Sequence, residues 1–311
     1  MAVTAVSDRR LAVALGAGLA LVSVSASARA QEMEPRAYSN SPIGVSFFIA
    51  GYSYSQGGLS LDPSLPVVDA TLRIHSGVFA YAHALDLWGK SGKLDIILPY
   101  SRLSGTGTLE GETAERRVSG FGDSRFRLSV NLYGAPALSA KDFGTYRRDL
   151  VIGASVQVSA PSGQYDSSKA INLGTNRWWI RPDVGFSKAF GVLTLDVTAS
   201  ATFYSNNDNF LGGQTLEQSP IYAAQANVSV DLGRGVWAAL SASYFRGGGT
   251  TLNGTPSDIE LGNARAGALL AVPVTPQHSI KLNVNHGVYT RFGTDFLTVG
   301  IAWQVRWGPG G

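Results

Sequence analysis

The chain has 311 residues, of which 44% are hydrophobic, 15% are charged and none is cysteine. The lack of cysteine excludes disulfides, thiolate metal sites and thiol chemistry. Three of the 25 basic residues and one of the 22 acidic residues lie in the first 30 positions, so the remainder carries 22 basic and 21 acidic residues. This near-neutral balance, without a basic stripe of interleaved aromatics, argues against a nucleic-acid partner.

The N-terminal residues have the layout of a secretory signal peptide. Arg9 and Arg10 precede the apolar run Leu11–Val24, and small residues follow it up to Ala28–Ala30. The run is short and rich in glycine and alanine, whereas a spanning helix needs about 20 apolar residues. We therefore predict a signal peptide over residues 1–30, removed after export.

From position 43 to position 307, apolar and polar residues alternate in repeated segments. Alternation with a period of two is typical of a β-strand with one apolar and one polar face. The pattern predicts twelve strands, at Ile43–Ser55, Ala70–Leu87, Lys93–Ser104, Ser119–Tyr133, Asp149–Ser162, Arg177–Phe190, Val192–Ser205, Pro220–Leu232, Val236–Arg246, Ile259–Val274, His278–Thr290 and Asp295–Trp307.

The connections between these strands are long and polar at one end and short at the other. Two of them depart from this rule: residues 134–148 form a long link, with a brief helix expected around 137–143, and residues 292–294 form a short one. Antiparallel strands with this arrangement of loops are the plan of an outer-membrane β-barrel. The fold class predicted for residues 43–307 is all-β, a transmembrane antiparallel up-and-down β-barrel of about 12 strands, with a C-terminal tail at 308–311.

Lipid would then cover the apolar face of each strand, and closure would remove the sheet edges. A secreted β-sandwich is the alternative, and it predicts shorter strands with loops of similar length at both ends. Alternate positions of a strand point to the same face, and on this basis the side chains predicted to face the lipid are Val45, Phe47, Ile49, Leu193, Leu195, Val197, Phe203, Ile280, Leu282, Val284 and Val288. The segment 31–42, "QEMEPRAYSNSP", is predicted to be periplasmic; it is too short for a plug domain but long enough to enter the lumen as a short stopper.

The last strand, "LTVGIAWQVRW", looks like the signal that barrel-assembly machinery reads on terminal strands. Such signals usually end at the aromatic residue, whereas four residues follow Trp307 here. We expect this strand to be the contact with that machinery.

The whole mature chain resembles a family of outer-membrane proteins associated with the MetA pathway of phenol degradation. The residues that carry the resemblance are "LDIILPYSRLSG" (Leu94–Gly105), "SGFGDSRFRLSVNLYGAPALS" (Ser119–Ser139) and "PSGQYDSSKAINLGTNRWWIRPDVGFSKAFG" (Pro161–Gly191). The resemblance implies a barrel of about twelve strands that takes up aromatic or other hydrophobic compounds. It implies no catalytic residues.

A pore needs a lumen lined by groups that set its selectivity. Charged residues that point into the lumen could form an eyelet that steers a solute, or they could pair with one another and close a narrow barrel. Their mixture of positive and negative charge favours pairing. The charged residues that parity turns inward are Arg73, His75, Asp95, Arg125, Arg127, Arg181, Asp183, Asp196, Asp231 and Lys281.

Aromatic residues near the loop end could contact an apolar solute, or they could anchor the barrel at the membrane interface. These residues are Tyr52, Tyr54, Tyr165, Trp178, Trp179, Tyr204 and Phe210.

The function predicted is an outer-membrane channel for small, aromatic or hydrophobic, compounds, with no cofactor, no metal and no catalytic residue. A structural or adhesive barrel without transport is one alternative. A barrel hydrolase is another, since His286 falls on the lipid side, but the sequence assigns it no serine nucleophile and contains no G-x-S-x-G. The oligomeric state is left open.

Overall fold

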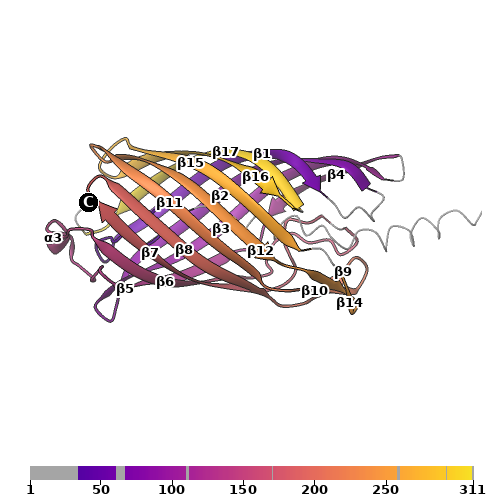
Figure 1. Cartoon of the computed structure of the whole chain (residues 1–311), viewed down its shortest axis with the longest axis horizontal. Coiled ribbons are helices and arrows are strands. Elements are labelled where there is room, and N and C mark those ends of the chain that lie inside the picture. Colours follow the sequence, from indigo (N-terminus) through magenta and orange to yellow (C-terminus); the bar gives the residue numbers. More distant parts are fainter. Residues whose placement is uncertain are drawn as a thin grey trace, which may run out of the picture.

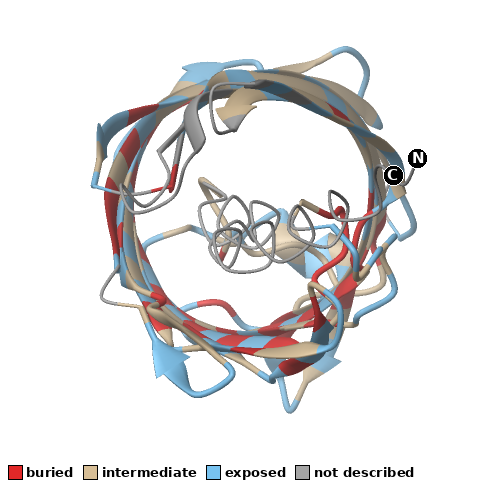
Figure 2. Cartoon of the chain, turned by 90° about the vertical axis from the view of Figure 1, so that its right-hand side faces the viewer, coloured by how far each residue is buried: buried red, intermediate tan, exposed pale blue. Residues whose placement is uncertain are grey.

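A computed structural model describes residues 34–60, 67–109, 112–169, 171–257, 260–291 and 293–309, and the predicted signal peptide lies outside them. The described chain forms a closed antiparallel barrel with strands at twelve positions (Figures 1 and 2). The barrel strands are β1 (Ser46–Ser60), β2 (Val67–Leu87), β3 (Lys90–Leu109), β4 (Glu112–Phe121), β5 (Arg125–Tyr133), β6 (Leu150–Ser159), β7 (Trp179–Phe190), β8 (Leu193–Tyr204), β11 (Ile221–Gly233), β12 (Val236–Gly247), β15 (Leu261–Pro273), β16 (His278–Thr290) and β17 (Gly293–Trp307).

Neighbouring barrel strands pair along the chain, except that β4 and β5 both pair with β3, and β1 pairs with β17 from Ser46 opposite Trp307 to Ser60 opposite Gly293, which closes the barrel. The short turns lie at one end, together with the helix α3 (Ala140–Phe143), which is capped by Ser139. At the other end, two long connections form a small sheet of β9 (Asn207–Phe210), β10 (Gln214–Gln218), β13 (Thr250–Leu252) and β14 (Thr255–Pro256). We call these the turn end and the loop end.

The predicted strand Ser119–Tyr133 is two strands that share one barrel position. β3 pairs with β4 near the loop end and with β5 nearer the turn end. Between them lies Asp123, whose buried carboxylate accepts hydrogen bonds from the backbone N–H of Gly163 at 2.9 Å and from both the N–H and hydroxyl of Thr175. The break therefore anchors the loop that follows β6.

Alternation governs the two faces of the wall. In β11, Asn227 and Ser229 are buried and point inward, whereas Tyr222 and Val228 are 59% and 47% exposed on the outer face. Large apolar side chains stay exposed around the outside of the barrel, where lipid would cover them. None of the described residues belongs to a helix long and apolar enough to span a membrane.

The face predicted for the first strand is wrong. Val45, Phe47 and Ile49 line a cavity inside the barrel, while Phe48 packs outside against Phe79 and Trp303, with ring centroids 6.4 Å away in both cases. Apolar residues occupy both parities of this strand, so its pattern cannot decide which face is lipid-exposed.

Candidate functional site: the lumen and its N-terminal segment

Most of the charged residues predicted to line the lumen do so, and they lie on six strands of the wall. The structure turns eight of the ten predicted residues inward: Asp95 on β3, Arg125 and Arg127 on β5, Arg181 and Asp183 on β7, Asp196 on β8, Asp231 on β11 and Lys281 on β16. In β5, β8 and β11 the polar residues keep to a single parity, which is why the pattern identified the face there. The strands β3, β7 and β16 also carry polar residues on the other parity, among them Arg102, Lys188 and His286.

Arg73 and His75 lie on the outer face instead, which corrects their predicted position. His75 sits opposite Tyr54 in the β1–β2 pairing, accepts or donates a 2.7 Å hydrogen bond with the Tyr52 hydroxyl, and is exposed, as Arg73 is. β2 has 21 residues, whereas a strand crosses the bilayer with about 9–11. The loop-end part of β2 thus extends past the hydrocarbon, where its outer face can be polar.

The segment from Glu34 to Pro42 lies inside the lumen. Arg36 donates hydrogen bonds to Asp231 at 2.6 Å and to Ser229 at 3.1 Å, and its backbone N–H donates to Asp196 at 3.2 Å. Its guanidinium also stacks 4.4 Å from the ring centre of Trp237. Arg148, in the link before β6, donates to the second oxygen of Asp231 at 2.8 Å. Asp231 therefore joins the segment to the turn-end rim.

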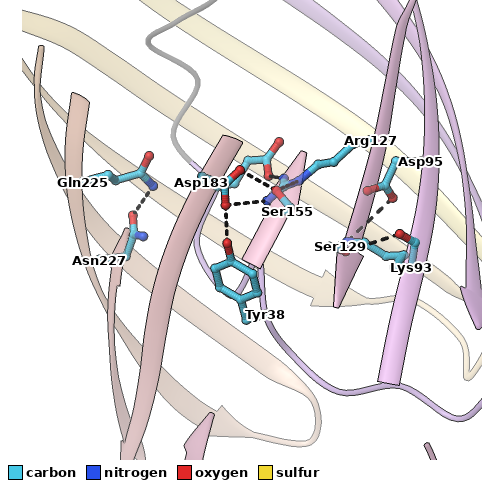
Figure 3. A network of polar contacts seen from close by, with 10 residues as sticks. Tyr38, Lys93, Asp95, Arg127, Ser129, Ser155, Asp183, Gln225 and Asn227 are labelled. Carbon is cyan, nitrogen blue, oxygen red and sulfur yellow. Dashed lines mark hydrogen bonds and ion pairs between the residues drawn. The ribbon is translucent and has the colours of Figure 1, made fainter. Parts of the chain in front are cut away.

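Nearer the middle of the barrel, Glu34 and Tyr38 are bound by a second network (Figure 3). The Tyr38 hydroxyl donates to Asp183, and Arg127 donates to Glu34. Arg127 also donates to the Ser155 hydroxyl at 2.9 Å, and Ser155 donates to Asp183. Three strands of the wall, β5, β6 and β7, are thereby linked to the segment through charge-assisted hydrogen bonds, which are the stronger kind.

Two glycines make room for the Tyr38 ring. A Cβ atom at Gly153 on β6 or at Gly185 on β7 would overlap that ring, and Tyr38 is only 3% exposed. Glycine inside a strand often marks close approach of another part of the chain. The two positions thus form a slot in the wall that fits an aromatic side chain.

The electrostatics of the segment follow from its burial. Burial opposes ionisation of Glu34, but the positive charge of Arg127, with Lys93 and Arg181 beyond it, outweighs this and lowers the pKa of Glu34 to about 2. Burial, together with the hydrogen bond to Asp183, raises the pKa of Tyr38 far above its ordinary range. Glu34 is thus a carboxylate and Tyr38 a neutral donor at physiological pH.

Beside the segment, the lumen contains two larger cavities. One of about 630 Å³ opens at the turn end, and one of about 420 Å³ lies towards the loop end; Pro35 and Ile49 border both. A third space of about 50 Å³ lies among Glu34, Arg127 and Asp183. The segment therefore fills the side of the lumen formed by β5 to β8 and β11, and the free space follows β15 to β17 and β1 to β3.

The aromatic residues predicted to contact solute do not form one site. Trp179 and Tyr204 face inward, with the Arg177 guanidinium 4.5 Å from the centre of the Tyr204 ring. The others lie elsewhere: Tyr52, Tyr54 and Trp178 on the outer face, and Tyr165 and Phe210 in the loop-end connections.

His286 lies on the outer face, as its parity predicts, and its ring is 4.0 Å from Asp295. In the part of the chain that the structure describes, no hydrogen bond joins the His286 ring to a serine. Groups of three or more residues able to hold a metal ion do not occur among the described residues either.

The sequence predicts that the segment 31–42 is long enough to enter the lumen, and its described part lies there, but the pattern does not indicate that Glu34, Arg36 and Tyr38 bind the wall. The pattern also places Phe47 and Ile49 on the lipid face, whereas they line a cavity in the lumen. Glycines at the inward parity of β6 and β7, at Gly153 and Gly185, are the signal that could have indicated a close approach there.

Comparisons with known proteins place the chain among outer-membrane barrels. Residues 51–301 match the model of a family described as "Putative MetA-pathway of phenol degradation". The structure resembles the COG4313 outer membrane channel from Pseudomonas putida F1, with a TM-score of 0.77 and 21% identity over 89% of this chain and 100% of that one. It resembles the β domain of the Bordetella autotransporter BrkA less closely, with a TM-score of 0.53 and 8% identity over 85% of this chain and 100% of that one. A comparison with curated protein sequences found no match.

Proposed function

Because the chain belongs to the MetA-pathway of phenol degradation family, we propose that it forms an outer-membrane channel for small aromatic or other hydrophobic molecules. Passage would be passive or facilitated, along the free side of the lumen. The observation that carries the proposal is the pair of cavities that share Pro35 and Ile49, because together they extend from the turn end towards the loop end beside the bound N-terminal segment.

The lining of these cavities supports a solute with an apolar body. Phe47, Ile49 and Trp237 border the turn-end cavity, and Leu103, Leu173 and Phe296 border or pack beside the loop-end one. Serine, threonine and asparagine side chains lie between these apolar groups. An apolar wall with a few polar groups is the usual lining of a small-molecule path.

The test is planar-bilayer conductance of the refolded mature protein, with and without phenol. We expect discrete conductance steps whose amplitude falls when phenol enters the lumen. A deletion strain should take up phenol more slowly at limiting concentration. A silent bilayer together with unchanged uptake would show that the barrel is not a channel and would favour the structural alternative.

Export and assembly complete the proposal. Cleavage of the signal peptide after Ala30 would leave Gln31 as the first residue, four positions before Pro35 in the lumen, and N-terminal sequencing of protein from outer membranes checks this.

The terminal strand β17 pairs with β1 along fifteen residues, and its Trp303 and Trp307 are 41% and 46% exposed on the outer side. Truncation before Trp303 should therefore abolish assembly, measured as loss of heat-modifiable migration.

A further inference from the structure

Charge is distributed unequally along the free side of the lumen. The described residues that line the turn-end cavity include five cationic side chains and one carboxylate: Arg36, Lys93, Arg234, Lys281, Arg306 and Asp95. The described lining of the loop-end cavity includes Arg125 and Arg265 and no carboxylate. A low-dielectric channel lined by one sign of charge concentrates solutes of the other sign.

The carboxylates inside the barrel already have partners. Glu34 is bound by Arg127, Asp183 by Tyr38 and Ser155, and Asp231 by Arg36 and Arg148. Asp95 lies 3.7 Å from Lys93 (Figure 3). Asp196 accepts a hydrogen bond from the backbone N–H of Arg36 at 3.2 Å, its other oxygen is buried without a hydrogen-bond partner, and it lines neither free cavity. Among the described residues that line the two free cavities, a cationic solute would therefore meet one carboxylate, Asp95, which already faces Lys93.

Lys281 differs from the other charged groups of the lumen. It lies between Ala271 and Ala302 of the adjacent strands, and in the described chain no hydrogen bond or ion pair joins its ammonium to another residue. The charges that act on it are Lys93, of the same sign, and Glu34, which Arg127 holds. Lys281 is half-buried and lines the turn-end cavity, and an ammonium group that faces such a space without a partner favours binding of an anion.

The position of Lys281 is also the junction of the two cavities. Lys281 lines the turn-end cavity, and the next inward residue of β16, Asn283, lines the loop-end cavity. Phe47, Ile49 and Trp237 border the same turn-end space as Lys281 and Lys93. An apolar surface and two ammonium groups therefore face one space, and they match a small molecule with an apolar ring and a negative charge.

We propose that Lys281, assisted by Lys93, is an anion-selecting site in the middle of the path, and that the solute class is small aromatic carboxylates. This inference rests on the proposed channel function and narrows its substrate class. A neutral aromatic would meet only the apolar surface, and an aromatic cation would be repelled. Charged side chains at a constriction are a general means of ion selection in pores.

The first test is the reversal potential of the refolded channel in a KCl gradient. We expect the wild-type channel to prefer anions and Lys281→Glu to lower the anion-to-cation permeability ratio on the order of tenfold, because a reversed charge beside the path changes the energy of an ion by more than RT. Lys281→Arg should keep the preference and Lys281→Gln should weaken it. Lys141→Glu, on the exposed helix α3, makes the same change in net charge outside the lumen and should leave the ratio unchanged.

The second test compares benzoate with benzylammonium, which have similar sizes and opposite charges, as blockers of the current. Benzoate should reduce the wild-type current at lower concentration than benzylammonium does, and Lys281→Gln should remove that difference. A conducting channel that prefers cations would contradict the anion site but not the proposed channel function. The same holds if benzoate and benzylammonium block the Lys281→Gln channel with the same difference as in the wild type. A channel that never conducts would overturn the proposed function itself.

Discussion

The two sides of the lumen wall are built differently. The side formed by β5 to β8 and β11 has buried charges, hydroxyls and two inward glycines, and the N-terminal segment is bound against it through Tyr38, Arg36 and Glu34. The side formed by β1 and β15 to β17 presents Ile49, Lys281 and Asn283 to open cavities. One side of the barrel wall therefore binds the N-terminal segment, and the other side borders the open path.

Removal of the N-terminal segment should have the largest effect on the difference between the bound side and the open side of the lumen. A mature chain that begins at Ser39 lacks Glu34, Arg36 and Tyr38, so the bound side loses its occupant and the path widens. We expect single-channel conductance to rise several-fold, because the passable cross-section grows. Conductance equal to that of the full mature chain would show that the segment does not obstruct the path.

The glycine slot offers a smaller change within the intact chain. Gly153→Ala places a methyl group where the Tyr38 ring lies, and overpacking of this kind costs about 1–3 kcal/mol. The segment should leave the wall more often, so that trypsin cleaves after Arg36 faster and the conductance fluctuates upward. Gly77→Ala is the matched control, because a Cβ atom there has no neighbour within 4 Å. Equal cleavage rates in the two variants would contradict the slot.

Sequence patterns predicted the strands best where each parity has a single character. In β8, Leu193, Leu195 and Val197 alternate with Thr194 and Asp196, and the structure has the predicted faces. In β1, Phe47, Phe48 and Ile49 are all apolar, so the faces were assigned incorrectly. Interruption of the fourth predicted strand depends on Asp123 and a loop that begins 40 positions later, which no local pattern contains.

The lumen was predictable only in part, for a related physical reason. The inward charges follow from parity, but their partners do not: Tyr38 and Asp183 are 145 positions apart, and Arg36 and Asp231 are 195 apart. Such pairs depend on barrel closure and on the path of a segment without regular structure. Composition therefore indicated that charges would pair, whereas the pairing of wall with N-terminal segment required the structure.

The hydrogen bond of Tyr38 provides a third way to alter the bound side. Tyr38→Phe keeps the ring in its slot and removes the donor to Asp183, and loss of a hydrogen bond to a charged group costs about 1.5–3 kcal/mol. Asp183 keeps Ser155 as a donor, so the barrel should remain folded with an unchanged melting temperature. We expect trypsin to cleave after Arg36 faster than in the wild type and at a rate similar to that in Gly153→Ala, because the two expected costs overlap.

Protonation of Glu34 should have the smallest effect on conductance, and the effect should be an increase. Its pKa is lowered from an ordinary 4.5 to about 2, so its contribution to docking is complete above 4.5 and is lost as the pH falls towards 2. The charged groups that act on Glu34 are Arg127, Lys93, Arg181, Asp95 and Lys281. Because the Glu34 side chain is 36% exposed, we expect its pair with Arg127 to contribute about 1 kcal/mol.

Conductance should therefore stay constant from neutral pH down to about 5 and rise as the pH falls towards about 3. Glu34→Gln mimics the protonated carboxyl, so it should show the raised conductance already at neutral pH and a weaker dependence on acid. A wild-type channel that closed on acidification, or a Glu34→Gln channel with the full wild-type pH dependence, would show that the contact between Glu34 and Arg127 does not hold the segment. In that case Tyr38 and Arg36 would account for the difference between the two sides.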